Sequence, residues 1–212
     1  MIRLALTLLL LTAPLMVAAE TSLEWARKQP QPTRAALVSI LKNSEMQSFF
    51  KACPANVYNG ANRTTGKPRS CGRKPNSCFT SCLKGESRAC FGLANALQTT
   101  HEITPNGNFT YPLYMKACAL GVANACVNAA ATVKNGSFLP GTRPAVAGSP
   151  SCQLATYSNA CTEGAAWGCT MMGNIYETGQ KGTEKNTAKS EAAYRRACDL
   201  SPKSGACSSA YR

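Results

Sequence analysis

Twelve cysteines are the residues of this 212-residue chain with the widest choice of chemistry. Thiolates can bind a metal, exchange electrons or pair as disulfides, and their spacing helps to decide between these uses. The Cys-x-x-Cys spacing favoured by oxidoreductases is absent. The single histidine, His101, excludes metal sites and active sites that need several histidines, and we interpret it as a surface residue. We therefore expect structural cysteines, no metal and no cofactor.

A second set of residues matches the short motifs of serine β-lactamases. These enzymes need a Ser-x-x-Lys nucleophile, a Ser-x-Asn or Tyr-x-Asn element and a strand with Lys-Thr/Ser-Gly. The chain offers three candidate nucleophiles and one match to each other element: Ser39, Ser48 and Ser81, then Tyr157-Ser158-Asn159, then Lys203-Ser204-Gly205. Such short motifs recur by chance, and the sequence shows no mixed α/β sheet to bring them together. We interpret them as coincidental, with weak β-lactam binding or hydrolysis as the alternative function.

The first residues predict export. Arg3 gives a positive start, residues 4–16 are mostly apolar, and small residues precede Glu20. This is the pattern of a secretory signal peptide, so we expect residues 1–19 to be removed after Ala19 and the protein to be secreted or periplasmic. No later stretch approaches the ~20 apolar residues of a membrane-spanning helix, so we expect no transmembrane segment. In an exported protein, an even number of cysteines predicts disulfides.

Eight of the cysteines form four regularly spaced pairs. The pairs are Cys82/Cys90, Cys118/Cys126, Cys161/Cys169 and Cys198/Cys207. Seven residues separate the partners in the first three pairs, and eight separate them in the last. The first cysteines follow one another at 36, 43 and 37 residues, and a Pro/Gly-rich insertion at 135–151 explains the long interval. This period predicts a repeat protein whose units bury their apolar faces by stacking.

Other residues recur with the cysteines. A tyrosine lies one helical turn before the first cysteine in three units: Tyr114, Tyr157 and Tyr194. A glycine lies three residues after it, as in Gly85, Gly121 and Gly164. The offsets are helical, and such a glycine commonly ends a helix, so each unit predicts helix, tight turn, helix, closed by a disulfide. We predict an all-α fold, an α/α superhelical solenoid stapled by disulfides.

These residues resemble the Sel-one-like repeat family, a relative of the tetratricopeptide repeats. The chain is most similar to the secreted cysteine-rich branch, the Helicobacter cysteine-rich proteins. The segments that carry the resemblance are 117–121, 168–179 and 194–200. The resemblance implies a repeat domain over residues 78–212 and a scaffold or adaptor that binds a protein or peptide. The resemblance also implies β-lactam binding or hydrolysis as an alternative function, because some members of this branch are described as penicillin-binding or weakly β-lactam-hydrolysing.

The residues before the repeats predict a helical cap at 20–55 and a basic loop at 56–77. The net charge of +13 falls to +12 without Arg3, and no acidic residue lies between Glu45 and Glu86. Such a block attracts polyanions, and in an exported protein these are acidic envelope polymers or proteins rather than nucleic acid. We favour a solvated loop without a dedicated site, and an anion-binding loop is the alternative. The basic residues that would form the anion-binding loop are Arg63, Lys67, Arg69, Arg73 and Lys74.

Four cysteines lie outside the repeating pairs and allow three connectivities. They are Cys53, Cys71, Cys78 and Cys152. Units of a solenoid mainly touch their neighbours, which disfavours a bond between Cys53 and Cys152. A bond from Cys53 to Cys71 or Cys78 is therefore favoured, and the pairing of the four cysteines is left open. Trp167 is expected to serve in packing.

Overall fold

The computed structural model describes residues 23–29, 31, 33–64, 67–99, 106–180, 182–203 and 205–209. The predicted signal peptide, residues 1–19, and His101 lie outside these residues. The helices are α3 (Thr33–Lys42), α4 (Ser44–Ser48), η1 (Phe49–Lys51), α5 (Pro54–Val57), η2 (Gly60–Asn62), α6 (Pro75–Leu83), α7 (Ser87–Thr99), α8 (Gly107–Ala119), α9 (Ala123–Asn135), α10 (Pro150–Thr162), α11 (Ala166–Thr178), α12 (Thr187–Leu200) and α13 (Ala206–Ser209). The part of the chain so described contains no β-strand, as the all-α prediction requires.

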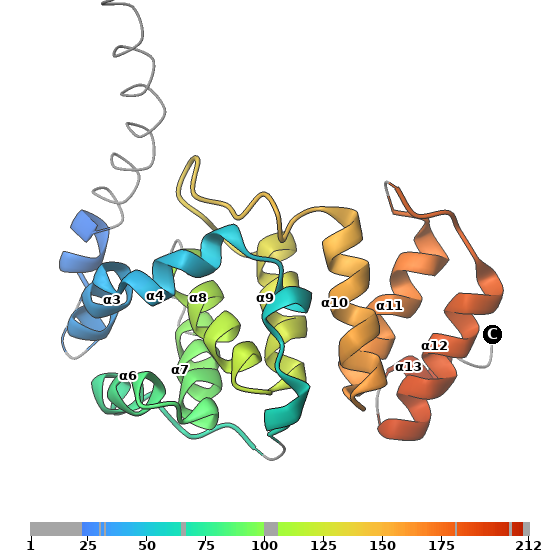
Figure 1. Cartoon of the computed structure of the whole chain (residues 1–212), viewed down its shortest axis with the longest axis horizontal. Coiled ribbons are helices and arrows are strands. Elements are labelled where there is room, and N and C mark those ends of the chain that lie inside the picture. Colours follow the sequence, from blue (N-terminus) through green and yellow to red (C-terminus); the bar gives the residue numbers. More distant parts are fainter. Residues whose placement is uncertain are drawn as a thin grey trace, which may run out of the picture.

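The helices from α6 onward are arranged in chain order along the long axis of the molecule (Figure 1). Each helix packs against the next, from α6 and α7 to α12 and α13, and α9 also contacts α11. Successive antiparallel pairs that pack mainly on their neighbours form an α/α solenoid. The predicted fold class is therefore confirmed.

The tight turns have the conformation that their glycines predict. Gly85, Gly121 and Gly164 have φ of +89°, +88° and +83°, where an L side chain would be strained. In each turn the glycine N–H donates to the carbonyl of the first cysteine of the pair, at 2.9–3.0 Å. The next N–H donates to the carbonyl one residue further back, also at 2.9–3.0 Å. These two bonds make a Schellman motif, which ends the first helix of each unit.

The disulfides of the repeats join the last turn of one helix to the first turn of the next. The bonds are Cys82–Cys90, Cys118–Cys126, Cys161–Cys169 and Cys198–Cys207, the pairs that the spacing predicts. Ser201 takes the place of the glycine in the fourth unit and has φ of −149°. Without a left-handed residue at that position the turn is longer, which accounts for the additional residue between Cys198 and Cys207.

The N-terminal segment runs along the repeats beyond the position of a terminal cap. α3 buries Ala36, Leu37 and Ile40 and packs against α6 and α8, as a cap would. The chain then continues through α4 and η1, and α5 contacts α8, α9 and α10. Segments far apart in the sequence therefore lie side by side in the middle of the molecule (Figure 1).

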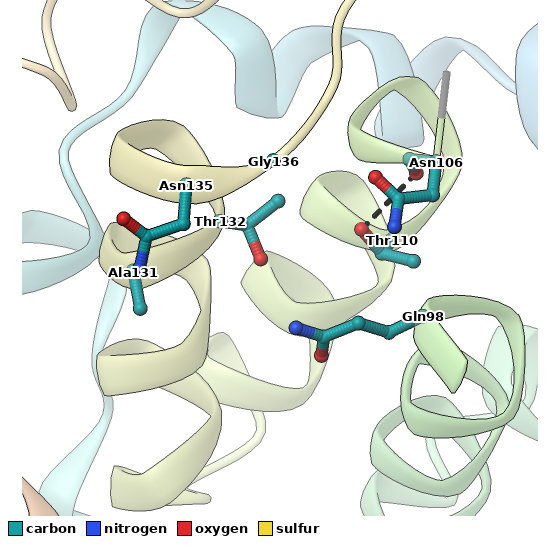
Figure 2. A pocket seen from close by; sticks show the side chains of 7 residues that line it. All are labelled: Gln98, Asn106, Thr110, Ala131, Thr132, Asn135 and Gly136. Atoms are coloured by element: carbon teal, nitrogen blue, oxygen red, sulfur yellow. Dashed lines mark hydrogen bonds between the residues drawn. The ribbon is translucent and has the colours of Figure 1, made fainter. Parts of the chain in front are cut away.

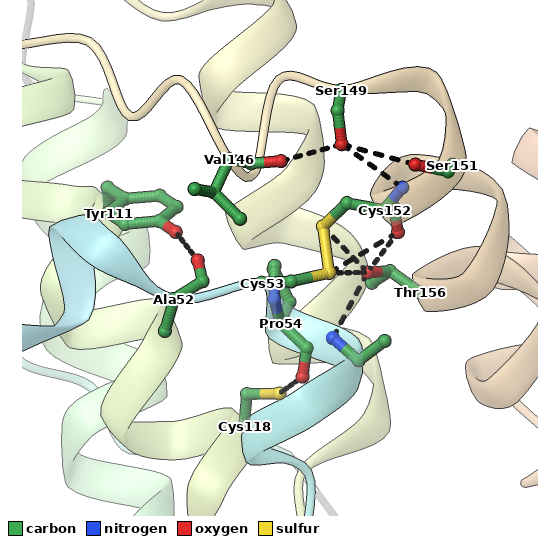
Figure 3. The surroundings of a disulfide bond; sticks show 11 residues. Ala52, Cys53, Pro54, Tyr111, Cys118, Val146, Ser149, Ser151, Cys152 and Thr156 are labelled. Atoms are coloured by element: carbon green, nitrogen blue, oxygen red, sulfur yellow. Dashed lines mark hydrogen bonds between the residues drawn. A yellow bond between two sulfur atoms is a disulfide. The ribbon is translucent and has the colours of Figure 1, made fainter. Parts of the chain in front are cut away.

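The remaining cysteines include the bond that the sequence disfavours. Cys53 is bonded to Cys152, across 99 residues, and Cys71 is bonded to Cys78. The physical reason is the course of α5, which reaches α10 and brings Cys53 beside the start of that helix (Figure 3). Thr156 completes the junction, because its hydroxyl donates to the Cys152 carbonyl at 2.8 Å and accepts from the Ala55 N–H at 3.2 Å.

The chain returns from α10 to α6 across the glycine turns. We call this segment, described at residues 58–64 and 67–74, the strap. The Thr64 N–H donates to the Gly121 carbonyl at 3.0 Å, and the Arg69 N–H donates to the Arg88 carbonyl at 3.0 Å. The predicted loop at 56–77 therefore differs from the structure, because it includes η2 and the first turn of α6. Its backbone is held against the repeats.

Candidate binding site

The basic side chains of the strap are exposed and spread over several turns. Arg69 is 3.0 Å from both Glu86 Oε2 and Ser81 Oγ in the first unit. Arg63 lies at the third unit, where its Nη2 would be 3.3 Å from a Cβ placed on Gly164. The remaining members of the predicted anion-binding loop are Lys67, Arg73 and Lys74. The Lys67 carbonyl accepts from Arg88 Nε at 2.7 Å, so this part of the strap is also tied to the first unit. Several polar groups of the strap thus fasten it to the turns.

The residues of the β-lactamase-like motifs are not brought together. Ser39, Ser48 and Ser81 lie on α3, α4 and α6, toward one end of the molecule, whereas α10 and α12 lie toward the other (Figure 1). Tyr157 is 1% exposed and belongs to the core between α9, α10 and α11. Lys203 follows α12, and Ser204 lies outside the described residues. Among the described residues, the motif serines of α3, α4 and α6 therefore lie apart from Tyr157 and Lys203.

A groove of about 330 Å³ lies where α9, α11, α12 and α13 meet, and we call it the α9–α11 groove. Trp167 lines it and is 47% exposed, so the expectation that Trp167 serves in packing was wrong. The reason is its place at the second position of α11, on the side opposite the buried Gly168 and Cys169. The other lining residues are Ala131, Lys134, Asn135, Thr170, Met171, Asn174, Tyr194, Gly205 and Ala206.

A smaller pocket of about 100 Å³ adjoins this groove, and we call it the amide pocket (Figure 2). Its walls come from the end of α7, the start of α8 and the end of α9. Gln98, Asn106 and Asn135 supply carboxamides, and the lining is completed by Thr110, Ala131, Thr132 and Gly136. Ala131 and Asn135 line the groove as well, so the two hollows share two residues of α9. Its volume is about that of three water molecules, enough for an amide or a carboxylate.

The three repeated tyrosines fill the seams between units, as their period predicts. Tyr114, Tyr157 and Tyr194 are at most 6% exposed. The Tyr114 hydroxyl is 2.8 Å from Asn95 Oδ1 and also contacts Gln98 Oε1. The Tyr194 hydroxyl donates to Glu177 Oε2 at 2.7 Å. The Tyr157 hydroxyl is equally buried but has no hydrogen-bond partner within the described part of the chain.

These tyrosines predict a loss of stability at high pH. Burial raises the pKa of Tyr157 to about 12, and burial together with the Glu177 carboxylate raises the pKa of Tyr194 to about 12. Tyrosine in an unfolded chain titrates near pH 10, so the unfolded state loses these protons first. The free energy of unfolding should therefore be insensitive to these groups below pH ~9 and fall between about pH 10 and 12. Urea unfolding in steps across this range, with phenolate absorbance as a second signal, checks this; a constant free energy up to about pH 11 would contradict it.

Other kinds of site find no support in the described residues. Within them, no three side chains of His, Cys, Asp or Glu come together as metal ligands. None of the helices described is both long enough and apolar enough to cross a membrane. No family model, curated protein or solved structure matches the chain. The likeness to Sel-one-like repeats thus rests on the repeated residues alone.

The sequence does not predict the α9–α11 groove, because the residues that line it come from several helices of different units. One signal was nevertheless present in the sequence. Trp167 lies two residues before Cys169, and the equivalent positions before Cys90 and Cys126 are Arg88 and Asn124, both polar and exposed. An aromatic residue at a polar position of the repeat marks an exposed aromatic side chain.

Proposed function

We propose that this chain is an exported scaffold protein of the Sel-one-like kind, which binds a protein or peptide partner in the α9–α11 groove. The observation that carries the proposal is the half-exposed Trp167 at the wall of a groove of about 330 Å³. Tryptophan is enriched among the residues that dominate the binding energy of protein interfaces. The volume is at the lower end of the range for ligand pockets, which suits one large side chain and its flanking main chain.

Six disulfides support the proposed compartment. Every cysteine of the described chain is paired, and none is free. Such a set persists in oxidising surroundings such as the periplasm or the extracellular medium. This agrees with the signal peptide predicted for residues 1–19, and both support a secreted or periplasmic protein.

Rigidity of the groove supports a scaffold role. α9 begins beside the Cys118–Cys126 bond and α11 begins beside the Cys161–Cys169 bond, so two cross-links fix the helices that form its walls. The Cys53–Cys152 bond also ties α10, which lies between them in the chain, to α5. A surface fixed in this way loses little conformational entropy when it binds, because its ordering is complete before the partner arrives.

Selection from a random library of eight-residue peptides with free carboxyl termini tests the proposal. The wild-type protein should enrich a related set of peptides, and Trp167→Ala should weaken binding of the enriched peptides at least tenfold. Leu83→Ala is the matched control, since Leu83 is a comparably exposed apolar residue, at 40%, on distant α6. It should bind as the wild type does.

Fluorescence gives a second measurement of the same event. Trp167 and Trp25 are the two tryptophans of the chain, and Trp25 packs against Phe109 with ring centroids 5.5 Å apart. In a Trp25→Phe background the emission reports on Trp167 alone, and an enriched peptide should shift it to the blue. Failure of the wild type to enrich any peptide, or equal loss in Leu83→Ala, would reject this groove as the binding site.

A further inference from the structure

The second unit differs from the first and third units at the residues that partner the seam tyrosines. Five residues after the second cysteine, the first and third units have Asn95 and Asn174, and the second has Ala131. Eight residues after it, the corresponding residues are Gln98, Glu177 and Lys134. The second unit therefore lacks, at both positions, a side chain that could accept a hydrogen bond from the hydroxyl of the next tyrosine, Tyr157. Alanine offers nothing to a hydroxyl, and the exposed ammonium of Lys134 has no acceptor.

Tyr157 shows the consequence inside the protein. Its ring packs with Val127 and Ala130 of α9, so it faces the helix that carries Ala131 and Lys134. Its hydroxyl is buried without a partner in the described part of the chain, whereas the hydroxyls of Tyr114 and Tyr194 are paired. A buried hydroxyl left unpaired destabilises a fold. Local departures of this kind, which reduce stability without an evident gain in packing, are typical of functional sites.

Ala131 shows the consequence at the surface. It lines both the α9–α11 groove and the amide pocket, and it shares this place only with Asn135. The residue in the equivalent place of the third unit, Asn174, also lines the groove, and it lies beside the Tyr194 hydroxyl. An asparagine at 131 would pair with Tyr157, but its carboxamide would also occupy the junction. The small alanine leaves that space free.

We propose that the α9–α11 groove and the amide pocket form one continuous site through Ala131, and that its ligand is an extended peptide bearing a carboxylate. This inference rests on the proposed function and specifies the ligand of the same groove. A peptide in extended conformation presents side chains to alternate sides, so an apolar side chain can lie against Trp167 while the chain passes Ala131.

The chemistry of the lining selects this ligand. Lys134 is the one charged side chain among the described residues that line the two hollows, so the site favours a negative group. The carboxamides of Gln98, Asn135 and Asn174 can both donate and accept, which matches the N–H and C=O groups of a peptide main chain. Met171 beside Trp167 gives an adaptable apolar wall for a side chain. The net charge of +13 also favours acidic partners.

Two substitutions separate the role of Ala131 from that of the unpaired hydroxyl. Ala131→Asn supplies a partner to Tyr157 and blocks the junction, whereas Tyr157→Phe removes the hydroxyl and leaves the junction open. Both variants should unfold at a urea concentration equal to or above that of the wild type. Only Ala131→Asn should weaken an enriched peptide, by at least tenfold, in the titration of Trp167 fluorescence. Unchanged affinity in Ala131→Asn would overturn the continuous site.

The source of the carboxylate is tested with two further libraries, one with amidated carboxyl termini and one lacking Asp and Glu. Loss of enrichment in the first assigns the carboxylate to the chain terminus, and loss in the second assigns it to a side chain. Enrichment in a third library, amidated and also lacking Asp and Glu, or full binding by Lys134→Gln, would overturn the acidic ligand. A blue shift with a chitin tetrasaccharide but with no peptide would overturn the peptide and indicate a glycan.

The outcomes distinguish this inference from the proposed function. If Trp167→Ala loses binding while Ala131→Asn retains it, the groove is a binding site and the continuous site is wrong. If Trp167→Ala binds as the wild type does, the proposed function itself fails. Circular dichroism of each variant, with mass spectrometry showing all six disulfides, excludes misfolding as the cause of a loss.

Discussion

Replacing Cys53 and Cys152 together with alanine should lower the free energy of unfolding by about 4.7 kcal/mol, the largest loss expected for any pair of cysteines. The bond closes a loop across 99 residues, and the stabilisation from a cross-link grows with the length of the loop it closes. The bond also joins α5 to α10, and both cysteines are buried, at 5% and 7% exposure. Its loss would release the N-terminal segment from the third unit.

The matched control is the pair Cys161 and Cys169, which lie 8 residues apart. The same chain-entropy relation gives about 2.6 kcal/mol for this short loop. Equilibrium unfolding in urea without reductant measures both variants against the wild type. If both double variants lose the same stability, or if the short-loop variant loses more, the proposed role of the long-range bond is wrong.

Gly121→Ala should be the most destabilising of the glycine substitutions in the turns, at about 3 kcal/mol or more. A non-glycine residue in the left-handed region costs about 1–2 kcal/mol, which accounts for part of the loss. The rest comes from the strap, because a Cβ at this position would overlap the carbonyl oxygen of Asn62. The strap would have to move away and give up the bond from the Thr64 N–H to the Gly121 carbonyl.

Gly85→Ala is the control that measures only the cost of placing a non-glycine residue in the left-handed region. Gly85 has φ of +89°, almost the same as the +88° of Gly121, but a Cβ there meets nothing within 4 Å. It should lose only about 1–2 kcal/mol. Urea unfolding gives the two losses, and trypsin should cleave after Arg63 faster in Gly121→Ala than in Gly85→Ala. Equal losses and equal cleavage would mean that the strap contributes nothing at this turn.

Much of the fold could be predicted from the sequence because its determinants are local. The first cysteine of a pair, the glycine three residues later and the second cysteine all lie within one helix–turn–helix unit. A left-handed turn and a short disulfide loop need no information from elsewhere in the chain. Repetition of these residues in successive units then predicts the stacking, as it does for Gly85, Gly121 and Gly164.

The N-terminal part could not be predicted in the same way, because its contacts are not local. Cys53 finds Cys152 only because α5 crosses α8 and α9 to reach α10. Nothing in the sequence around Cys53 specifies this course. The strap is a similar case, since the Thr64 N–H reaches a carbonyl in the second unit and Arg69 reaches Glu86 in the first.

The candidate site lies between these cases. The groove beside Trp167 forms where three units pack together. The sequence of a single unit therefore does not predict it. The departure at Ala131, however, is visible once the repeats are aligned on their cysteines, since Asn95 and Asn174 occupy the equivalent positions. Its consequences depend on packing between units, which leaves the Tyr157 hydroxyl unpaired among the described residues and places Ala131 in the lining of two hollows.

A ¹H–¹⁵N spectrum of the ¹⁵N-labelled protein, recorded while an enriched acidic peptide is added, locates the binding site. We expect the largest shifts at the Trp167 indole N–H and Ala131 backbone N–H, and at the side-chain amides of Asn135 and Asn174. The strap amides, such as those of Thr64 and Arg69, should remain in place. Shifts confined to the strap, with the groove residues unchanged, would contradict the account and move the binding site to the basic loop.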